Sequence, residues 1–272
     1  MDISQIVEDK FKDVDTGSRK EISFKGEIGN LPFSAYLYIK PNTDKLFVML
    51  NGAINQKREA GIPVYQRWSW HEEFPGSVLY ITDPTLLKYT DIILAWYVGD
   101  KLNRVDIRLA DFVTRVAAKL NVSKIVPYGS SGGGFAAIQL ASNIGNGCIA
   151  VAINPQTIVF NYLEEAVDKY IHLCWHGFDK ANLRNDLSFN AIENYQIKKP
   201  KILYVQNKVD IFHYDDHFIP FVNALGLDKD LIQQPLNEQS GAVKVLLYDH
   251  ESGHAAEPKD LLQEIFSAID DF

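Results

Sequence analysis

The sequence predicts an α/β fold: a three-layer α/β/α sandwich whose mostly parallel sheet is preceded by an antiparallel hairpin. Three observations support this prediction. Two early segments alternate apolar and polar residues, later apolar runs show no alternation, and helical patterns separate several of those runs. Strands that are apolar on both faces are typical of parallel sheets covered on both sides, and alternating strands and helices build such sheets.

The predicted hairpin lies near the N-terminus. Lys20 to Ile28 and Phe33 to Ile39 alternate with the period of a strand, and Gly29-Asn30-Leu31-Pro32 separates them. Turn residues between two alternating runs are typical of a β-hairpin. The hairpin is therefore expected at an antiparallel edge of the sheet.

The later apolar runs are interpreted as buried strands, and three helical patterns accompany them. The strands are expected at Lys45–Leu50, Ser77–Ile81, Asp91–Ala95, Lys124–Tyr128, Cys148–Ile153, Lys201–Val205 and Val243–Tyr248. Val105 to Leu120 repeats apolar residues at spacings of three and four, which predicts an amphipathic helix. A second helix is expected at Phe135–Ser142, and a third at Pro258–Ile269 with its proline near the first turn.

One interval, Gln156 to Pro200, is too long for a simple crossover connection. We interpret residues 156–200 as a helical cap over one end of the sheet. An ordinary elongated crossover with an extra surface helix is the alternative. The chain has no internal repeat and no linker-like composition, so residues 1–272 are expected to form one domain.

Composition excludes several classes of function. Lys and Arg number 27 against 35 Asp and Glu, and the net charge of −8 provides no basic field for nucleic acid or anionic lipid. Nucleic acid is therefore not an expected partner. No stretch approaches the roughly 18 apolar residues of a membrane span, so none is expected. Two cysteines are too few for a disulfide framework, which favours the cytoplasm; composition indicates no oligomeric state.

The most informative motif is a glycine cluster between a predicted strand and a predicted helix. Gly129-Ser130-Ser131-Gly132-Gly133 fits G-x-S-x-G in one register only, with Ser131 at its centre. Small residues on both sides allow a sharp strand-to-helix turn that exposes the serine hydroxyl. The turn also directs backbone N–H groups, chiefly that of Gly132, toward an oxyanion formed beside Ser131.

Two other interpretations of the glycine cluster remain open. A P-loop would need G-K-[ST], which is missing, and a dinucleotide fingerprint is met only loosely by Gly132, Gly134 and Ala137. The acidic residue expected after the next strand is replaced by Asn154-Pro155. A tight turn with glycines for packing alone is the other alternative.

With these motifs the chain resembles the α/β-hydrolase superfamily, from the Lys45 strand to the final helix. That family carries its nucleophile, acid and histidine in this chain order. The resemblance implies Asp210, which follows the Lys201 strand, as the acid, and His254, which follows the Val243 strand, as the base. Ser131 would attack, His254 would transfer the proton, and Asp210 would orient the imidazole.

The resemblance also implies a second oxyanion donor from the loop after the Lys45 strand. Leu50-Asn51-Gly52-Ala53 is similar to the family's His-Gly-x loop, with Asn51 in place of the usual histidine. The backbone N–H of Ala53 is the implied donor, and that of Gly52 is the next candidate.

Other titratable residues compete for these roles. His250 is the rival base and is otherwise a surface histidine, while Asp215 and Asp216 compete with Asp210. Asp83 is interpreted as a turn former. His213 and His217 have the i, i+4 spacing of metal ligands, but the glutamate of H-E-x-x-H is missing, so no metal is predicted.

Aromatic residues near the expected site suggest a binding platform. Trp68, Trp70 and Trp96 can stack on sugar rings or acyl chains, although core packing is the alternative, and Ser130 and His213 are further candidate substrate contacts. The function predicted is a cofactor-independent serine hydrolase that cleaves a carboxylic ester, in a small molecule or on a glycan. An acyltransferase with the same triad and a catalytically silent binding protein are the alternatives.

Overall fold

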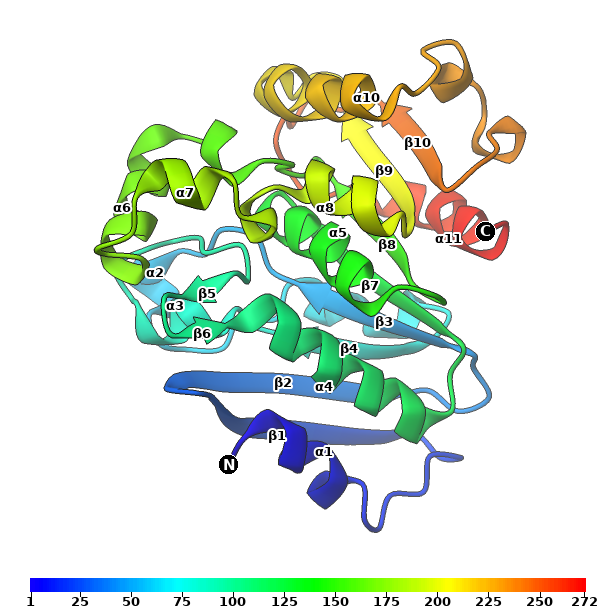
Figure 1. The fold of residues 1–272 in the computed structure, drawn as a ribbon. Helices are drawn as coiled ribbons and strands as arrows, with labels where there is room; N and C mark the ends of the chain where they lie inside the picture. Colours follow the sequence, from blue (N-terminus) through cyan, green and yellow to red (C-terminus); the bar gives the residue numbers. More distant parts are fainter.

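An eight-stranded sheet runs through the molecule, which the computed structural model describes from residue 1 to 272 except for the side chain of Arg58 (Figure 1). Its order is β1-β2-β4-β3-β7-β8-β9-β10. Only the β1–β2 and β2–β4 pairs are antiparallel, and the other neighbours are parallel. The strands are β1 Lys20–Ile28, β2 Leu31–Ile39, β3 Lys45–Leu50, β4 Ser77–Ile81, β7 Lys124–Ser130, β8 Ile149–Ile153, β9 Lys201–Asn207 and β10 Val243–Tyr248, with a separate pair, β5 Gly99–Asp100 and β6 Asn103–Arg104.

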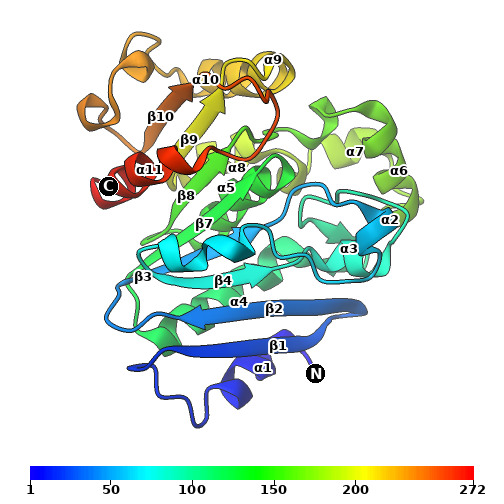
Figure 2. The same cartoon turned by 180° about the vertical axis from the view of Figure 1, so that it is seen from behind.

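Helices cover both faces of this sheet, which confirms the predicted three-layer sandwich. Helices α1, α4, α5 and α8 lie on the face seen in Figure 1, whereas α11 packs on the opposite face, seen in Figure 2. The helices are α1 Ile3–Lys10, α2 Gln56–Glu59, α3 Pro84–Lys88, α4 Val105–Leu120, α5 Gly132–Ile144, α6 Glu164–Cys174, α7 Lys180–Arg184, α8 Ala191–Lys198, α9 Ile211–His213, α10 Ile219–Leu225 and α11 Leu262–Asp270. Among the described residues no helix has both the length and the apolar character needed to cross a bilayer.

The N-terminal hairpin is confirmed, with a tighter turn than the sequence indicated. Ile28 pairs with Leu31, so the turn contains only Gly29 and Asn30. Gly29 has a φ of 61°, in the left-handed region that such two-residue turns require. Strand β2 therefore begins at Leu31, two residues earlier than predicted, and continues through Pro32.

The strand predicted at Asp91–Ala95 is wrong, because this segment is a loop. Ile92, Leu94 and Ala95 are buried in the core, but the backbone turns directly afterwards, since Trp96 and Tyr97 have φ values of 53° and 58°. Apolar character here reflects burial against neighbouring loops and not pairing in the sheet.

Residues 156–200 form a series of short helices between β8 and β9. Helix α8 packs along α5, while α6 and α7 lie beyond the end of the sheet near α2 and α3 (Figures 1 and 2). The Tyr170 hydroxyl of α6 donates to the carbonyl of Gly99 at 2.7 Å. This contact joins the interval to the loop after Trp96, and whether the interval acts as a cap stays a prediction.

Candidate active site

Ser131 occupies a strained turn between β7 and α5. Its backbone angles are φ 57° and ψ −124°, a conformation that residues other than glycine rarely adopt. The Ser131 N–H donates to the carbonyl of Ile153 at 2.9 Å, and the Ser131 carbonyl accepts from the N–H of Gly134 at 3.0 Å. Neighbouring backbone thus holds the strained residue from both sides. The side chain of Ser131 lies almost entirely beneath the surface.

The glycines around Ser131 allow backbone segments to approach closely. A Cβ atom on Gly129 would lie 2.4 Å from the Gly133 carbonyl carbon, and one on Gly133 would lie 2.4 Å from the Leu50 carbonyl oxygen. A Cβ on Gly52 would lie 2.9 Å from the Ser130 carbonyl oxygen. The G-x-S-x-G spacing is therefore a steric requirement of this turn, and the loop after β3 lies directly against it.

Backbone N–H groups in two places are candidates for an oxyanion hole. Gly132 begins α5, and the first N–H groups of a helix have no partner within it and lie at the positive end of its dipole. On the facing loop, the Gly52 N–H donates to the Gln66 side-chain oxygen at 3.2 Å. Gly52 is therefore engaged, whereas Ala53 is the exposed residue of this loop.

Asn51 fixes that loop from inside. Its Oδ1 accepts from the Asp83 N–H at 3.0 Å and from the Tyr97 hydroxyl at 2.6 Å. Asp83 caps α3 by accepting from the Thr85 N–H at 2.9 Å, as its interpretation as a turn former predicts. Burial raises the pKa of Asp83 to about 6, although hydrogen bonds from Tyr97 and Thr85 oppose the shift.

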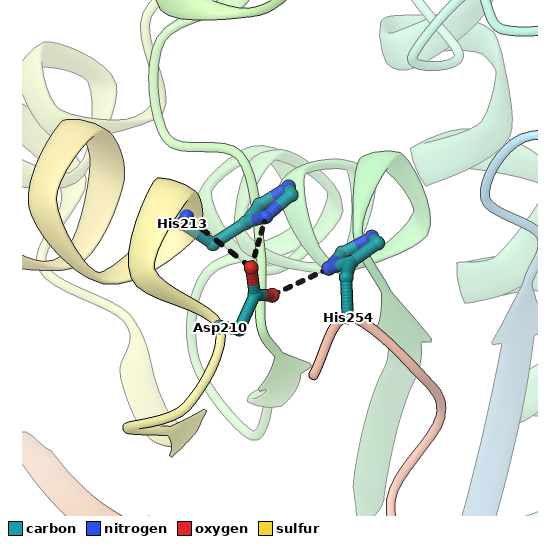
Figure 3. A group of neighbouring side chains, drawn as sticks. All are labelled: Asp210, His213 and His254. Atoms are coloured by element: carbon teal, nitrogen blue, oxygen red, sulfur yellow. Dashed lines mark hydrogen bonds and ion pairs between the residues drawn. The ribbon is translucent and has the colours of Figure 1, made fainter. Parts of the chain in front are cut away.

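Asp210 joins two histidines at the carboxyl end of β9 (Figure 3). One carboxylate oxygen lies 2.6 Å from Nδ1 of His254, and the other lies 3.0 Å from Nδ1 of His213. The two imidazole rings stack with their centroids 3.8 Å apart and an interplanar angle of 5°. His254, from the loop after β10, is the more exposed of the two, since 38% of its side chain is accessible.

The electrostatics of this group favour a carboxylate and a neutral second histidine. Burial acts to raise the pKa of Asp210, but hydrogen bonds from His213 and His254 outweigh it and hold the pKa well below its usual value. Burial lowers the pKa of His213, partly opposed by the Asp210 carboxylate. Asp210 is therefore ionised at neutral pH, while His213 is uncharged.

The competing residues lie elsewhere. His250 is exposed, and its Nδ1 is 2.6 Å from the Ser252 hydroxyl. Asp215 and Asp216 are exposed in the π-helical turn Tyr214–Phe218, and the contact to His254 comes from Asp210.

The described residues with the geometry closest to a metal site are Asp210, His213 and His254, whose potential ligand atoms lie within 4.8 Å of one another. The two Nδ1 atoms in this group already bind the carboxylate. His217 is not part of this group, and its Nδ1 accepts from the Thr157 N–H at 3.2 Å. Hydrogen bonding within the group accounts for its compactness.

Gln156 is the residue that contacts the Ser131 hydroxyl oxygen. Its Nε2 lies 2.8 Å from Ser131 Oγ and 2.9 Å from Nε2 of His213, and its Oε1 accepts from the Trp96 indole at 3.1 Å. Sequence reasoning did not single out Gln156. Its position three residues after β8, beside the strand that carries Ser131, is the signal that places it at this edge.

Two asparagines hold the backbone on either side of His254. Asn207 Nδ2 donates to the carbonyl of Gly253 at 2.8 Å, and Asn154 Nδ2 donates to the carbonyl of Ala255 at 3.0 Å. The Asn154 Oδ1 accepts from the Asn207 N–H at 2.7 Å. The ends of β8 and β9 thereby position the loop of residues 249–257 after β10, which carries His254 and is called the histidine loop below.

A buried ion pair fixes the same loop three residues beyond His254. Arg67 and Glu257 form a bidentate pair, with Arg67 Nε 2.9 Å from one carboxylate oxygen, and their side chains are only 4% and 0% accessible. The Tyr128 hydroxyl also donates to Glu257. The histidine loop is thus joined to β7 and to the loop before β4.

The candidate platform residues separate into two groups. Trp96 is buried and reaches the site through Gln156. The Trp68 ring stacks on Tyr65 with centroids 5.6 Å apart, and Trp70 lies beneath Arg67. Within the described part of the chain, the hydrogen bonds and ring contacts of Ser131, Asp210 and His254 do not include these two rings. Ser130, at the end of β7, is half-buried next to Ser131. Substrate contact by Trp68, Trp70 and Ser130 stays a prediction.

Comparison with known proteins gives a fold. No protein-family model matches the sequence, and no curated protein matches it. Among solved structures, an acetyl xylan esterase from Paenibacillus sp. R4 is 14% identical with a TM-score of 0.59, covering 99% of this chain and 93% of that one. An S-formylglutathione hydrolase from Agrobacterium tumefaciens is 14% identical with a TM-score of 0.57, covering 95% of each chain. An esterase from Pyrococcus furiosus is 14% identical with a TM-score of 0.58, and the match covers 94% of this chain and 91% of that one. The chain therefore has the α/β-hydrolase fold.

Proposed function

We propose that this protein is a serine hydrolase that cleaves carboxylic esters through an acyl-enzyme, with Ser131 as nucleophile, His254 as base and Asp210 as acid. The observation that supports it most is the Asp210–His254 hydrogen bond of 2.6 Å between residues 44 apart in sequence. It lies at the carboxyl end of β9, and the strained Ser131 lies at the carboxyl end of β7 in the same parallel array. Ligand sites of open α/β sheets form at this edge.

The chemistry follows from the groups present. Ser131 Oγ attacks the ester carbonyl while its proton passes to Nε2 of His254, whose Nδ1–H is held by the Asp210 carboxylate. The tetrahedral intermediate expels the alcohol, which takes the proton back from His254. A water molecule then gives a proton to His254 and attacks the acyl-enzyme, and Ser131 leaves with that proton as the acid is released.

Substrate binding must bring Ser131 and His254 together. In the described residues Ser131 is hydrogen-bonded to Gln156 and not to His254. Catalytic hydrogen bonds are often long or misaligned without substrate and tighten in the complex. The 38% exposure of the His254 side chain leaves it room for this adjustment.

The oxyanion would be held by the N–H groups of Gly132 and Ala53. Gly132 is supported by its place at the start of α5. Ala53 is preferred over Gly52 because the Gly52 N–H already donates to Gln66. Two preorganised donors of this kind are the usual source of transition-state stabilisation in acyl transfer.

The acyl group would enter a mostly apolar cavity that borders the turn around Ser131 through Leu94. The cavity has a volume of about 290 Å³ and lies between the 91–94 loop and the start of α6, with Leu94, Leu163 and Ala166 in its wall. Leu94 also lies against Gly132, because a Cβ there would be 2.4 Å from Leu94 Cδ1. Acetylated carbohydrates belong in the substrate panel because one similar structure is named an acetyl xylan esterase.

A fluorophosphonate probe tests the nucleophile. Wild type should be labelled and Ser131→Ala should not, while Ser142→Ala, a matched control further along α5, should be labelled normally. Labelling of Ser131→Ala at the wild-type rate, or none of wild type, would refute the assignment.

Turnover of aryl esters with increasing acyl length tests the base and the substrate together. His254→Ala should abolish it and His250→Ala should not. Products formed with added alcohols distinguish hydrolysis from acyl transfer.

A further inference from the structure

We propose that Gln156 sets the direction of the Ser131 hydroxyl, so that its proton is available only to the base, and that His213 keeps Gln156 in this orientation. This inference rests on the proposed function. It assigns Gln156 a catalytic role, since it contacts the nucleophilic oxygen, and His213 a positioning role.

Trp96 and His213 fix the orientation of the Gln156 amide, one from its oxygen and the other from its amino group. The indole N–H is a donor only, and it lies 3.1 Å from Gln156 Oε1. The oxygen of the amide must therefore face Trp96, and the amino group must face Ser131 and His213. Gln156 is fully buried, so no water competes for these bonds.

The two N–H bonds of Gln156 then determine the state of both neighbours. One N–H is donated to His213 Nε2, at 2.9 Å, so that nitrogen is unprotonated and Nδ1 carries the proton given to Asp210. His213 is thereby locked as one neutral tautomer. A second positive charge on His213, 3.8 Å from the His254 ring, would oppose the imidazolium formed during catalysis.

The other N–H is donated to Ser131 Oγ at 2.8 Å. Because Oγ is the acceptor in this bond, the serine proton cannot be given to Gln156 and is left for His254. As the proton departs, the same N–H stabilises the negative charge that develops on Oγ, since hydrogen bonds to charged atoms are the stronger ones. Hydrogen-bond donation in this network thus runs in one direction, from Trp96 to Gln156, from Gln156 to His213 and from His213 to Asp210.

Substitution of Gln156 tests this directly. Gln156→Met removes both N–H donors and should lower kcat and the rate of phosphonate labelling about 100-fold, the scale of losing one oriented donor, with KM unchanged. Gln156→Glu should lower both further, because a carboxylate would accept a hydrogen bond from the serine hydroxyl and turn its proton away from His254. Gln139→Met is the matched control: Gln139 is a buried glutamine that donates to Leu187 O at 2.7 Å outside the network. It should retain wild-type kcat.

The outcomes of this experiment distinguish failure of the inference from failure of the proposed function. If wild type is labelled and Gln156→Met is labelled at the same rate, the inference is overturned while the proposed function stands. If wild type is not labelled, the proposed function fails first. His213→Phe, which keeps a stacked ring without hydrogen bonds, should lower kcat about tenfold and leave labelling detectable. Complete loss in His213→Phe with normal labelling of His254→Ala would make His213 the base and overturn the inference.

Discussion

The ion pair between Arg67 and Glu257 should dominate the stability of the histidine loop. Both side chains are almost inaccessible to water, and the pair is bidentate. Glu257→Leu leaves the Arg67 charge buried without a partner and removes the acceptor of the Tyr128 hydroxyl. Removing one partner of such a pair costs about 3–5 kcal/mol.

That cost is large enough to measure by thermal or urea unfolding. At about 2–4 °C per kcal/mol for a chain of roughly this size, the melting temperature should fall by about 6–20 °C. Arg67→Met should show a similar loss, because it leaves the Glu257 carboxylate unpaired. The double variant Arg67→Met/Glu257→Leu should be more stable than either single variant, since apolar replacement of a whole buried pair is often nearly neutral.

A double-mutant cycle distinguishes this reasoning from simple loss of packing. Singles that each lose less than about 1 kcal/mol would show that the pair is not desolvated as described. A double variant that loses the sum of both singles would show that the two charges do not compensate one another. In Glu257→Gln, which keeps the shape of the side chain, kcat should fall more than KM rises, because His254 lies three residues away.

Three further outcomes are expected. Gly129→Ala should lose about 3 kcal/mol or fail to fold, because its Cβ would lie 2.4 Å from the Gly133 carbonyl carbon; wild-type stability in urea would contradict the described turn. Asn207→Ala should lower both the urea midpoint and kcat, since its side chain bonds His250 and Gly253 in the histidine loop; an unchanged kcat would mean that other contacts suffice. Burial lowers the pKa of His217 to about 3, so the unfolded chain binds more protons between about pH 6.5 and pH 3 and stability is lost as pH falls through that window. Between pH 7 and pH 4 the wild-type protein should therefore lose about 3 kcal/mol more of its free energy of unfolding than His217→Asn does. Parallel curves of unfolding free energy against pH for the two proteins would exclude His217 as the cause.

The fold could be predicted from the sequence because continuous apolar runs and G-x-S-x-G are local signals. Ser131 is a candidate because of its own neighbours, and the resemblance implies Asp210 and His254 as its partners; the roles of all three stay predictions. The strand expected at Asp91–Ala95 failed because apolar residues record burial, whether or not the backbone pairs.

The supporting side chains could not be predicted in the same way. Gln156, Asn207 and Glu257 act through contacts with residues far away in the chain, and nothing in their local sequence identifies the partner. His213 shows the same limit, since its i, i+3 relation to Asp210 is local but its stacking on His254 is not.

The Arg67–Glu257 contact also bears on the order in which the site can be assembled. Its partners are 190 residues apart, so closing this loop is a non-local event of the kind that slows folding. The serine turn, at the end of β7, contacts β3 and β8, whereas the contact between His254 and Asp210 requires β9 and β10 to be in place. A partly folded chain that contains only β3, β7 and β8 would hold the proposed nucleophile without its proposed base, so we expect hydrolytic activity only once β9 and β10 have joined the sheet.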